Sequence, residues 1–504
     1  MAKRALISVS DKTGVETFAR TLTELGYEIL STGGTQKTLA AAKIPVTPVE
    51  TVTEFPECFG GRVKTMHPAI MGGILFRRDN ADDVKEAKKL GIEPIDIVVV
   101  NLYPFGKTAA DPEKSRAEVI EQIDIGGPTL LRSAAKNHSH VTVICDVADY
   151  GRVLAELEKG ESSDELRDEL ATKAFFHTAS YDTMISSWLS EGKNWGVLLR
   201  GGTALRYGEN PHQWGKYFGM GKVEDPASWG KKLQGKDTSY LNILDADAAW
   251  SAVCEFEEPT AVFVKHANPS GIASRGNIED AFQAAYDADR LSAFGVIIAL
   301  NRECSKVIAQ KVIDQKMFVE VIVAKSYEAG ALEILSQKPN IRVIEQSMTP
   351  PKEQTTYRSV LGGMLMQNAD TKIVTEAELT VVTKKKPTKE QIKDLLFAWK
   401  CVKYCKSNAI VFAHDLTTVG LGTGQTSRVD ATWIAAKRAG EKSRGAVMAS
   451  DAFFPFPDSV EEAAKHGISV IIQPGGSIRD AEVFAKAEEL GLVMVTTGVR
   501  AFRH

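Results

Sequence analysis

The sequence lacks the cysteine pattern of a secreted or zinc-binding protein. Its six cysteines are scattered, none forms a C-x-x-C pair, and the closest two, Cys401 and Cys405, lie one helical turn apart. We therefore expect no bound transition metal. Buried, reduced thiols in a reducing compartment are the more natural interpretation of these cysteines.

The sequence also lacks a long apolar run. No stretch reaches the roughly 20 residues that cross a bilayer. The apolar run near the N-terminus ends at Asp11, which makes it too short for the core of a signal peptide. We expect a cytoplasmic protein that has no membrane partner.

An excess of charge of one sign is missing as well. The formal net charge of −4 and the pI near 6.2 give no general attraction to nucleic acid. No nucleic-acid partner is expected, and local clusters must bind any anionic ligand. The 504 residues are 43% hydrophobic and 25% charged, the composition of a globular protein of about three folding units.

The chain does contain a regular alternation of short apolar runs and amphipathic helical stretches. In the first half this pattern predicts an α/β fold with a largely parallel sheet. A polar, glycine-bearing segment at residues 190–196 predicts a domain boundary, and weaker breaks at 349–351 and 384–387 divide the second part into two lobes. The expected strands are residues 5–9, 27–30, 95–102, 141–145, 261–264, 296–300, 319–324, 409–413 and 469–472.

Two strand-to-helix turns in the first domain are candidate phosphate sites. Residues 10–13 and 31–35 place hydroxyls and glycines at helix N-termini, where backbone N–H groups and the helix dipole favour an anion. Ordinary helix capping is the alternative for either turn alone. The residues concerned are Ser10, Asp11, Lys12, Thr32, Gly33, Gly34 and Thr35.

Further polar clusters follow other predicted strands and helices of this domain. A glycine-rich segment, residues 60–68, carries Arg62 and Lys64, while Tyr103 lies just after a strand. Asp124 precedes a helix start, and Lys136 comes later. Ligands of open α/β sheets bind beyond the carboxyl ends of the strands, so these clusters together predict one site.

The second part contains adjacent Lys265 and His266 at the end of a buried apolar strand. A histidine can move protons near neutral pH, and an ammonium beside it stabilises developing negative charge. A strand-end histidine bonded to backbone is the alternative. Other polar segments of this part support a site, and they are residues 205–213, 406–409, 422–428 and 450–456.

These motifs, in this order from Ser8 to His504, closely resemble the bifunctional purine-synthesis enzymes that join AICAR transformylase to IMP cyclohydrolase. The resemblance implies a methylglyoxal-synthase-like cyclohydrolase domain at 1–198. It also implies a deaminase-like α/β transformylase domain at 199–504, with two similar lobes at about 199–350 and 351–504. The implied ligands are AICAR, FAICAR, IMP and 10-formyltetrahydrofolate, bound by a homodimer that shares its transformylase sites. A monovalent cation is left open.

The resemblance assigns site residues in both domains. The cyclohydrolase nucleotide site matches Ser10, Asp11, Lys12, Thr32, Gly33, Gly34, Thr35, Arg62, Val63, Thr65, Asn101 and Ile125, and its catalytic cluster matches Lys64, Tyr103, Asp124 and Lys136. The AICAR positions of the transformylase match Arg206, Tyr207, Lys265, His266, Gly295, Glu320, Asn408, Arg428, Phe453 and Arg500, and the folate positions match Asp458, Ser477 and Ile478. Departures occur at Met71, where many relatives have histidine, at Ser270, often Cys or Ala, and at Glu320, in some Asp.

The chemistry that these residues support is formyl transfer followed by ring closure. We expect His266 to take a proton from the AICAR amine, with Lys265 and Asn408 stabilising the tetrahedral oxyanion and the leaving nitrogen. For ring closure we expect Lys136 with Asp124 to transfer protons. Lys64 with Tyr103 would polarise the formyl oxygen.

Two other functions remain open at this point. A zinc nucleotide deaminase needs His-x-Glu and a later Pro-Cys-x-x-Cys, and the sequence after His266 has neither. A non-catalytic nucleotide sensor is the second alternative, which the Lys265–His266 pair disfavours.

Overall fold

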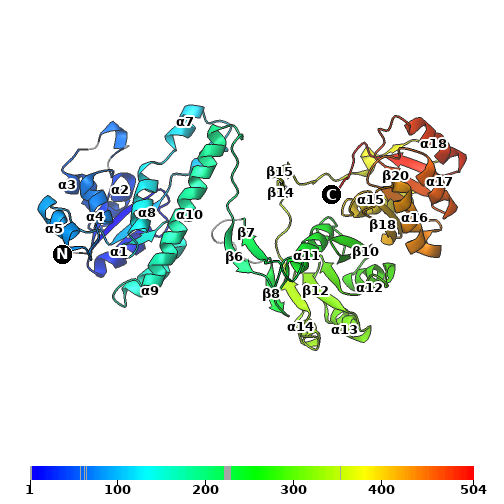
Figure 1. The fold of residues 1–504 in the computed structure, drawn as a ribbon, viewed down its shortest axis with the longest axis horizontal. Helices are drawn as coiled ribbons and strands as arrows, with labels where there is room; N and C mark the ends of the chain where they lie inside the picture. Colours follow the sequence, from blue (N-terminus) through cyan, green and yellow to red (C-terminus); the bar gives the residue numbers. More distant parts are fainter. Residues whose placement is uncertain (1–2, 57, 62, 64, 221–228, 352) are drawn as a thin grey trace. The chain divides into compact units, whose positions relative to one another are not determined.

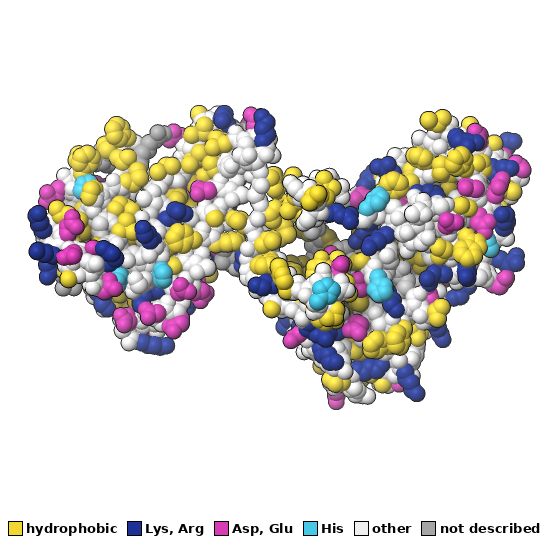
Figure 2. Space-filling model, viewed as in Figure 1, with side chains coloured by type: hydrophobic (Ala, Val, Ile, Leu, Met, Phe, Trp, Pro, Cys, Tyr) yellow, Lys and Arg dark blue, Asp and Glu magenta, His cyan; other side chains and the backbone are white. Residues whose placement is uncertain are grey.

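The computed structural model describes residues 3–56, 58–61, 63, 65–220, 229–351 and 353–504. The chain forms two compact units, Met1–Leu198 and Leu199–His504, drawn in Figure 1. Among the described residues, no helix has both the length and the apolar surface to cross a membrane. On the face drawn in Figure 2, Lys and Arg side chains are interspersed with Asp and Glu.

The first unit is built on a five-stranded sheet in which every strand pair is parallel, in the order β3-β2-β1-β4-β5. Two inner strands contain continuous buried apolar runs, residues 5–7 in β1 and 97–100 in β4, as expected for a parallel sheet covered by helices. The strands are β1 (Lys3–Val9), β2 (Tyr27–Ser31), β3 (Thr47–Pro48), β4 (Ile97–Asn101) and β5 (Thr142–Ile144).

Helices surround this sheet, and the long helix α10 lies beside α8 and β5 (Figure 1). The helices are α1 (Val15–Glu24), α2 (Gly33–Ala41), α3 (Val49–Thr53), α4 (Pro68–Leu75), α5 (Ala81–Leu90), α6 (Phe105–Ala109), α7 (Arg116–Glu121), α8 (Gly126–Lys136), α9 (Tyr150–Leu157) and α10 (Asp164–Leu189).

The second unit is built on a 12-stranded sheet whose two halves repeat one topology, in the order β16-β21-β20-β19-β17-β18-β10-β9-β11-β12-β13-β8. Its strands are β8 (Lys231–Gln234), β9 (Thr260–Lys265), β10 (Asn268–Ser274), β11 (Val296–Leu300), β12 (Val319–Ala324), β13 (Arg342–Glu345), β16 (Thr380–Val381), β17 (Ile410–His414), β18 (Thr417–Gly422), β19 (Val447–Ser450), β20 (Val470–Gln473) and β21 (Val493–Thr496). Two separate hairpins, β6 (Arg200–Ala204) with β7 (Lys216–Gly219) and β14 (Thr355–Val360) with β15 (Gly363–Asn368), lie outside this sheet.

Each lobe contributes a helix, an antiparallel hairpin, a second helix and then parallel strands that alternate with helices. The first lobe has α11 (Tyr240–Val253), α12 (Ile278–Ala288), α13 (Lys306–Asp314) and α14 (Ala329–Leu335), and the second has α15 (Lys389–Val402), α16 (Arg428–Ala439), α17 (Asp458–Lys465) and α18 (Asp480–Glu489). The hairpins β9–β10 and β17–β18 meet where β10 pairs with β18, in the middle of the sheet.

The repeat extends to individual atoms of the hairpin turns. His266 and Ala267 have φ of 54° and 57°, and Asp415 and Leu416 have 47° and 48° in the second lobe. Both N–H groups of the first turn donate to the Asp245 carboxylate at 3.2 and 2.7 Å. Asp394 accepts from the second turn in the same way, at 3.0 and 2.8 Å. A carboxylate of the preceding helix therefore shapes each turn.

Glycine allows a helix to pack directly on each hairpin. A Cβ atom on Gly271 would lie 2.1 Å from the carbonyl oxygen of Ala285 in α12, and one on Gly420 would lie 2.2 Å from that of Ala435 in α16. The sequence had predicted β9, β11, β12, β17 and β20, but it missed the buried strands β13, β19 and β21 and also β10 and β18. The last two have a physical reason. Their glycine-bearing segments read as loops.

We predict that Gly420→Ala destabilises the second unit by roughly 1–3 kcal/mol, because the new methyl group must displace the backbone of α16. Gly276→Ala is the matched control, since nothing lies within 4 Å of that Cβ position. Calorimetric unfolding of the full chain measures both. Equal melting temperatures of the two variants would contradict the prediction.

Candidate active sites

The first unit contains a cavity of 780 Å³ at the carboxyl ends of β1, β2 and β4. The structure thus brings the separate strand-end clusters together. Of the residues expected there, those that line the cavity are Ser10, Lys12, Thr32, Gly33, Gly34, Thr35, Thr65, Asn101, Tyr103, Asp124 and Ile125. Ser8, Phe59 and Glu121 also line it and were not expected.

One end of this cavity is suited to a phosphate. Thr32 precedes α2, and its hydroxyl is buried without a hydrogen-bond partner although its residue lines the cavity. The Lys12 ammonium lies near the same helix start, 3.7 Å from where a Cβ on Gly34 would be. Neither Thr32 nor Gly14, which precedes α1, caps its helix with a side chain. Ordinary capping therefore does not explain these turns, and an anion would satisfy both the hydroxyl and the helix dipole.

The loop beside this position is held by side chains that were expected to contact the nucleotide. The Asn101 amide oxygen accepts from the N–H groups of Ser10 and Asp11 at 2.5 and 2.9 Å, and the Thr35 hydroxyl donates to the Val9 carbonyl at 3.0 Å. Hydrogen bonds from Thr13 lower the pKa of the exposed Asp11 carboxyl. Asn101, Asp11 and Thr35 thus fix the shape of the loop.

Asp124 and Tyr103 lie together at the other side of the cavity. Asp124 accepts from the Gly127 N–H at 2.7 Å, and burial raises the pKa of its carboxyl. Burial, followed by the nearby Asp124 charge, raises the pKa of the Tyr103 phenol. The Tyr181 hydroxyl of α10 accepts from the Asp124 N–H at 2.9 Å and donates to the Gln122 carbonyl at 2.8 Å. A carboxyl group of raised pKa and a phenol therefore line one cavity.

Other predicted members of the cyclohydrolase cluster are not seen there. Lys136 is exposed at the last position of α8, ten residues and about 15 Å from Gly126 at the start of the helix. Lys136 does not line the cavity, and its proton transfer with Asp124 stays a prediction. Arg62 and Lys64 lie outside the described residues, and Val63 is half-buried.

In the second unit, the turn with Lys265 and His266 is open to solvent. His266 is exposed, and the half-buried Lys265 donates to the Phe294 carbonyl at 2.7 Å. Gly295 follows that carbonyl and donates to Phe318 at 2.8 Å. The Lys265–His266 pair is thus available to a ligand.

A hydrogen bond joins this turn to the second lobe. The Asn268 side-chain oxygen accepts from the Lys406 N–H at 3.0 Å, two residues before Asn408. Lys265, His266 and Asn408 therefore belong to one region of the unit.

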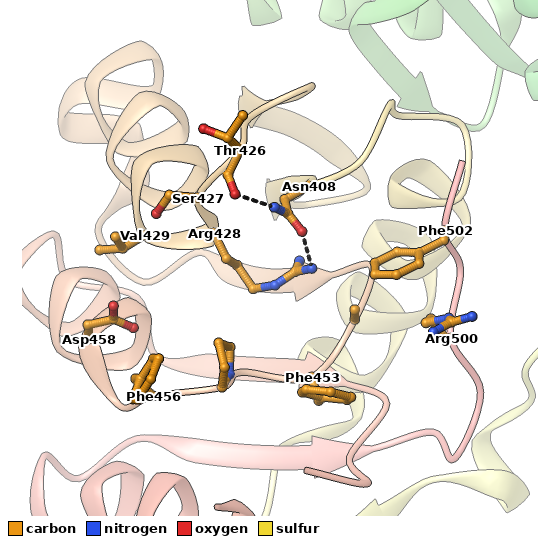
Figure 3. A pocket seen from close by; sticks show the side chains of 12 residues that line it. Asn408, Thr426, Ser427, Arg428, Val429, Phe453, Phe456, Asp458, Arg500 and Phe502 are labelled. Atoms are coloured by element: carbon orange, nitrogen blue, oxygen red, sulfur yellow. Dashed lines mark hydrogen bonds between the residues drawn. The ribbon is translucent and has the colours of Figure 1, made fainter. Parts of the chain in front are cut away.

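Asn408 borders a cavity of 470 Å³ in the second lobe, shown in Figure 3. The Asn408 oxygen accepts from Arg428 at 2.7 Å, and its amide nitrogen donates to the Gln425 and Thr426 carbonyls at 3.0 and 3.2 Å. Arg428 is buried and also pairs with the fully buried Asp451. Phe453, Asp458 and Arg500 complete the expected residues that line this cavity.

The remaining folate positions lie at its edge. The Ser477 hydroxyl accepts from the Arg479 N–H at 3.1 Å, and the Arg479 guanidinium covers the ring of Phe456, a lining residue, at 4.7 Å. Ile478, between these two residues, is fully exposed.

Arg206, Tyr207 and Glu320 form a separate group in the first lobe. The Arg206 guanidinium covers the Tyr207 ring at 5.3 Å, and Glu320 pairs with Arg342 at 2.6 Å. Arg342 also donates to the carbonyl of Asp237. A hydrogen bond from Lys232, and then the charges of Arg206 and Arg342, lower the pKa of the Asp237 carboxyl. None of these residues lines the cavity beside Asn408. Within the described residues, no three His, Cys, Asp or Glu side chains could hold a metal ion.

Comparison with known proteins agrees with this architecture. A sequence model described as "AICARFT/IMPCHase bienzyme" matches residues 134–438, and one for the MGS-like domain matches 14–129. The α/β fold with a methylglyoxal-synthase-like first domain is thus confirmed. A solved structure titled "Crystal structure of ForH" is 36% identical and covers 38% of this chain and all of its own, with a TM-score of 0.35.

Two curated relatives are similar over their whole length. The proteins named bifunctional purine biosynthesis protein PurH of Bacillus cytotoxicus and of Oceanobacillus iheyensis are each 50% identical to this chain, with all of both chains covered. The chain therefore belongs to the AICARFT/IMPCHase bienzyme family.

Proposed function

We propose that this protein carries out the last two steps of IMP synthesis. Formyl transfer from 10-formyltetrahydrofolate to AICAR gives FAICAR, and dehydrative cyclisation of FAICAR gives IMP. The observation that carries the proposal is the presence of two separate polar sites in a chain that matches relatives of this family over their whole length. One is the Lys265–His266 turn joined to Asn408, and the other is the Asp124–Tyr103 cavity.

For formyl transfer, His266 is the proton acceptor. The AICAR amine is conjugated to its ring and carboxamide, so it attacks the formyl carbon poorly unless its proton is removed as the new C–N bond forms. The imidazole of His266 is exposed, and the backbone beneath it is fixed by Asp245. The proton lost by the amine passes to His266, and the tetrahydrofolate nitrogen leaves with a proton returned to it.

The donor to the tetrahedral oxyanion is Lys265 rather than Asn408. Both N–H groups of the Asn408 amide are taken by carbonyl oxygens, whereas the Lys265 ammonium has three N–H donors and gives one to the Phe294 carbonyl. Asn408 acts in this mechanism by orienting Arg428. The Phe453 and Phe456 rings and the Asp458 carboxylate around the neighbouring cavity suit a flat, hydrogen-bonding folate ring.

A homodimer with shared transformylase sites would unite the two groups of AICAR residues. Arg206, Tyr207 and Glu320 lie apart from Asn408 within one chain, and a second copy can supply them. The β14–β15 hairpin supports this, because isolated two-stranded hairpins are barely stable and this one exposes Leu361 and Leu365. A reducing, cytoplasmic location suits the buried free thiols.

For ring closure, Asp124 and Tyr103 act on the formyl group and the carboxamide. The carboxamide nitrogen bonds to the formyl carbon while Asp124 takes its proton and Tyr103 donates to the formyl oxygen. The proton held by Asp124 then passes to the hydroxyl so formed, which leaves as water, while the formamide nitrogen gives its proton to the Tyr103 phenolate. The start of α2 with Thr32 and Lys12 binds the phosphate.

The first test mixes the purified protein with AICAR and 10-formyltetrahydrofolate, and IMP is the expected product. We expect His266→Ala to lower formyl transfer by about 10²- to 10⁴-fold, because general base catalysis contributes that much. Cyclisation of added FAICAR should be unchanged. His466→Ala, whose ring contacts Glu462 on α17, is the control. Normal transfer by His266→Ala would remove His266 from the mechanism.

The second test concerns Asp124. Its carboxylate must be unprotonated to act as the base, and burial raises its pKa above the ordinary 3.8, so cyclisation should fall on the acid side at a higher pH than an ordinary Asp would give. We expect Asp124→Asn to slow cyclisation by about 10²-fold or more and to abolish this acid limb. A pH–rate profile with the limb intact in Asp124→Asn would contradict the role.

The third test concerns the phosphate position. Thr32→Val removes a hydroxyl that has no protein partner, so we expect weaker IMP binding, by about tenfold or more, at unchanged melting temperature. Affinity for inosine, which lacks the phosphate, should stay the same. Thr35→Val, by contrast, should lower the melting temperature because it loses the bond to Val9. Calorimetric titration would refute the assignment if both ligands weakened equally.

A further inference from the structure

Ser407, the residue before Asn408, contacts two other parts of the transformylase site. Its hydroxyl donates to the Asp451 carboxylate at 2.5 Å and accepts from the Arg503 N–H at 3.0 Å. Its own N–H donates to the Arg503 carbonyl at 2.9 Å. One small side chain therefore connects the segment of Asn408 to the end of β19 and to the last residues of the sequence.

These contacts are part of a ring of hydrogen bonds and an ion pair that includes Asn408. Asp451 has no exposed surface, and its other carboxylate oxygen pairs with Arg428. Arg428 in turn donates to the Asn408 oxygen at 2.7 Å (Figure 3). A chain of polar contacts thus runs from Ser407 through Asp451 and Arg428 to Asn408, which is the neighbour of Ser407 in sequence.

The final segment, residues 500–504, alternates between this network and the cavity. Ala501 donates to the Asp451 carbonyl at 2.9 Å. The Arg503 N–H donates to the Ser407 hydroxyl, and the Arg503 carbonyl accepts from the Ser407 N–H. Arg500, which precedes Ala501, and Phe502, which lies between Ala501 and Arg503, line the cavity. Such alternation is typical of an extended segment, in which every second residue faces the same way. Anchoring of Ala501 and Arg503 therefore sets the positions of the two lining side chains.

The first lobe provides an internal comparison. Asn301 is the counterpart of Asp451. The Asn301 N–H donates to the carbonyl of Thr260, at the start of β9, at 3.3 Å. The Asp451 N–H likewise donates to the carbonyl of Ala409, just before β17, at 3.3 Å. The Asn301 side chain contacts only the nearby backbone, including the Phe256 carbonyl at 2.9 Å. The repeated fold thus forms in that lobe without a buried carboxylate, an arginine or a final segment at this point.

We propose that Ser407 and the backbone of Arg503 are positioning elements of the transformylase site. They hold Asn408 and Arg428 on one side, while the Lys406–Asn268 bond holds the same segment against the Lys265–His266 turn on the other. This inference rests on the proposed formyl transfer. A shift of about 1 Å in a catalytic arrangement can cost about 10²-fold in rate, so loss of this anchoring should be seen in kcat.

The test compares Ser407→Ala with Ser443→Ala. Ser443 is also buried in the second lobe, and its hydroxyl contacts the Gly440 and His466 carbonyls at 2.7 Å, away from the cavity. We expect Ser407→Ala to lower the kcat of formyl transfer by about 10- to 100-fold with AICAR KM changed less than about threefold. FAICAR cyclisation by the same preparation should be unchanged. Ser443→Ala should lower the melting temperature and keep the wild-type kcat.

A second pair of variants isolates the main-chain bond. Arg503→Ala and Arg503→Pro both remove the side chain, but only proline also removes the N–H that donates to Ser407. We expect Arg503→Pro to have the lower kcat, by about tenfold.

Equal kcat values for the Arg503 pair, or a wild-type kcat for Ser407→Ala, would overturn the inference alone. A wild-type protein that makes no FAICAR would overturn the proposed function and this inference with it.

Discussion

The antiparallel contact between β10 and β18 brings the two lobes of the second unit into one sheet. Few main-chain bonds form this seam, and Thr418 adds to them because its hydroxyl accepts from the Ile272 N–H at 3.0 Å. The seam places the turn of the β9–β10 hairpin beside Lys406 of the second lobe, and the turn of the β17–β18 hairpin beside Arg275 of the first lobe. The Lys406–Asn268 bond, and with it the proximity of His266 to Asn408, depends on this pairing.

The two hairpin turns have the same backbone conformation but differ in the side chains that cover them. Arg275 of the first lobe covers the turn of the second lobe. Its guanidinium donates to the Asp415 carbonyl at 2.6 Å and to the Thr417 hydroxyl at 2.7 Å. Gln425 stands at the equivalent position near the first turn, and its side chain bonds to Thr423 instead. One turn is thus tied to its neighbour by a cation, whereas the other leaves Lys265 and His266 accessible. The duplicated element has kept its backbone conformation while the side chains at its tip differ.

Much of the fold could be predicted because buried parallel strands are continuous apolar runs. The strands at 296–300 and 319–324 were predicted with their observed bounds. β10 and β18 could not be, since the glycines that let α12 and α16 approach also remove the apolar signal. Ser10, Thr32 and Asn101, at the ends of predicted strands, line the cavity of the first unit. They could be found because the end of an apolar run marks the end of a strand.

Other parts of the sites depend on contacts between distant segments. The role of Lys136 stays a prediction, because Lys136 ends α8 and does not line the cavity at the start of that helix. Neither Ser407, which lies within the polar segment 406–409, nor Tyr181 was assigned a role from the sequence. Their partners lie 44 and 96 residues away for Ser407 and 57 and 59 residues away for Tyr181, and only the folded chain brings them together.

The carboxylates of Asp245 and Asp394 have a consequence for how such a protein can diverge. Each one binds the two N–H groups of its turn, so the bend is specified from the helix beneath and not by the residues at its tip. His266 and Ala267 at one tip and Asp415 and Leu416 at the other share nothing in side-chain chemistry, yet they adopt the same left-handed backbone. Mutation at the tip can therefore explore new reactivity while the scaffold that aims it stays unchanged.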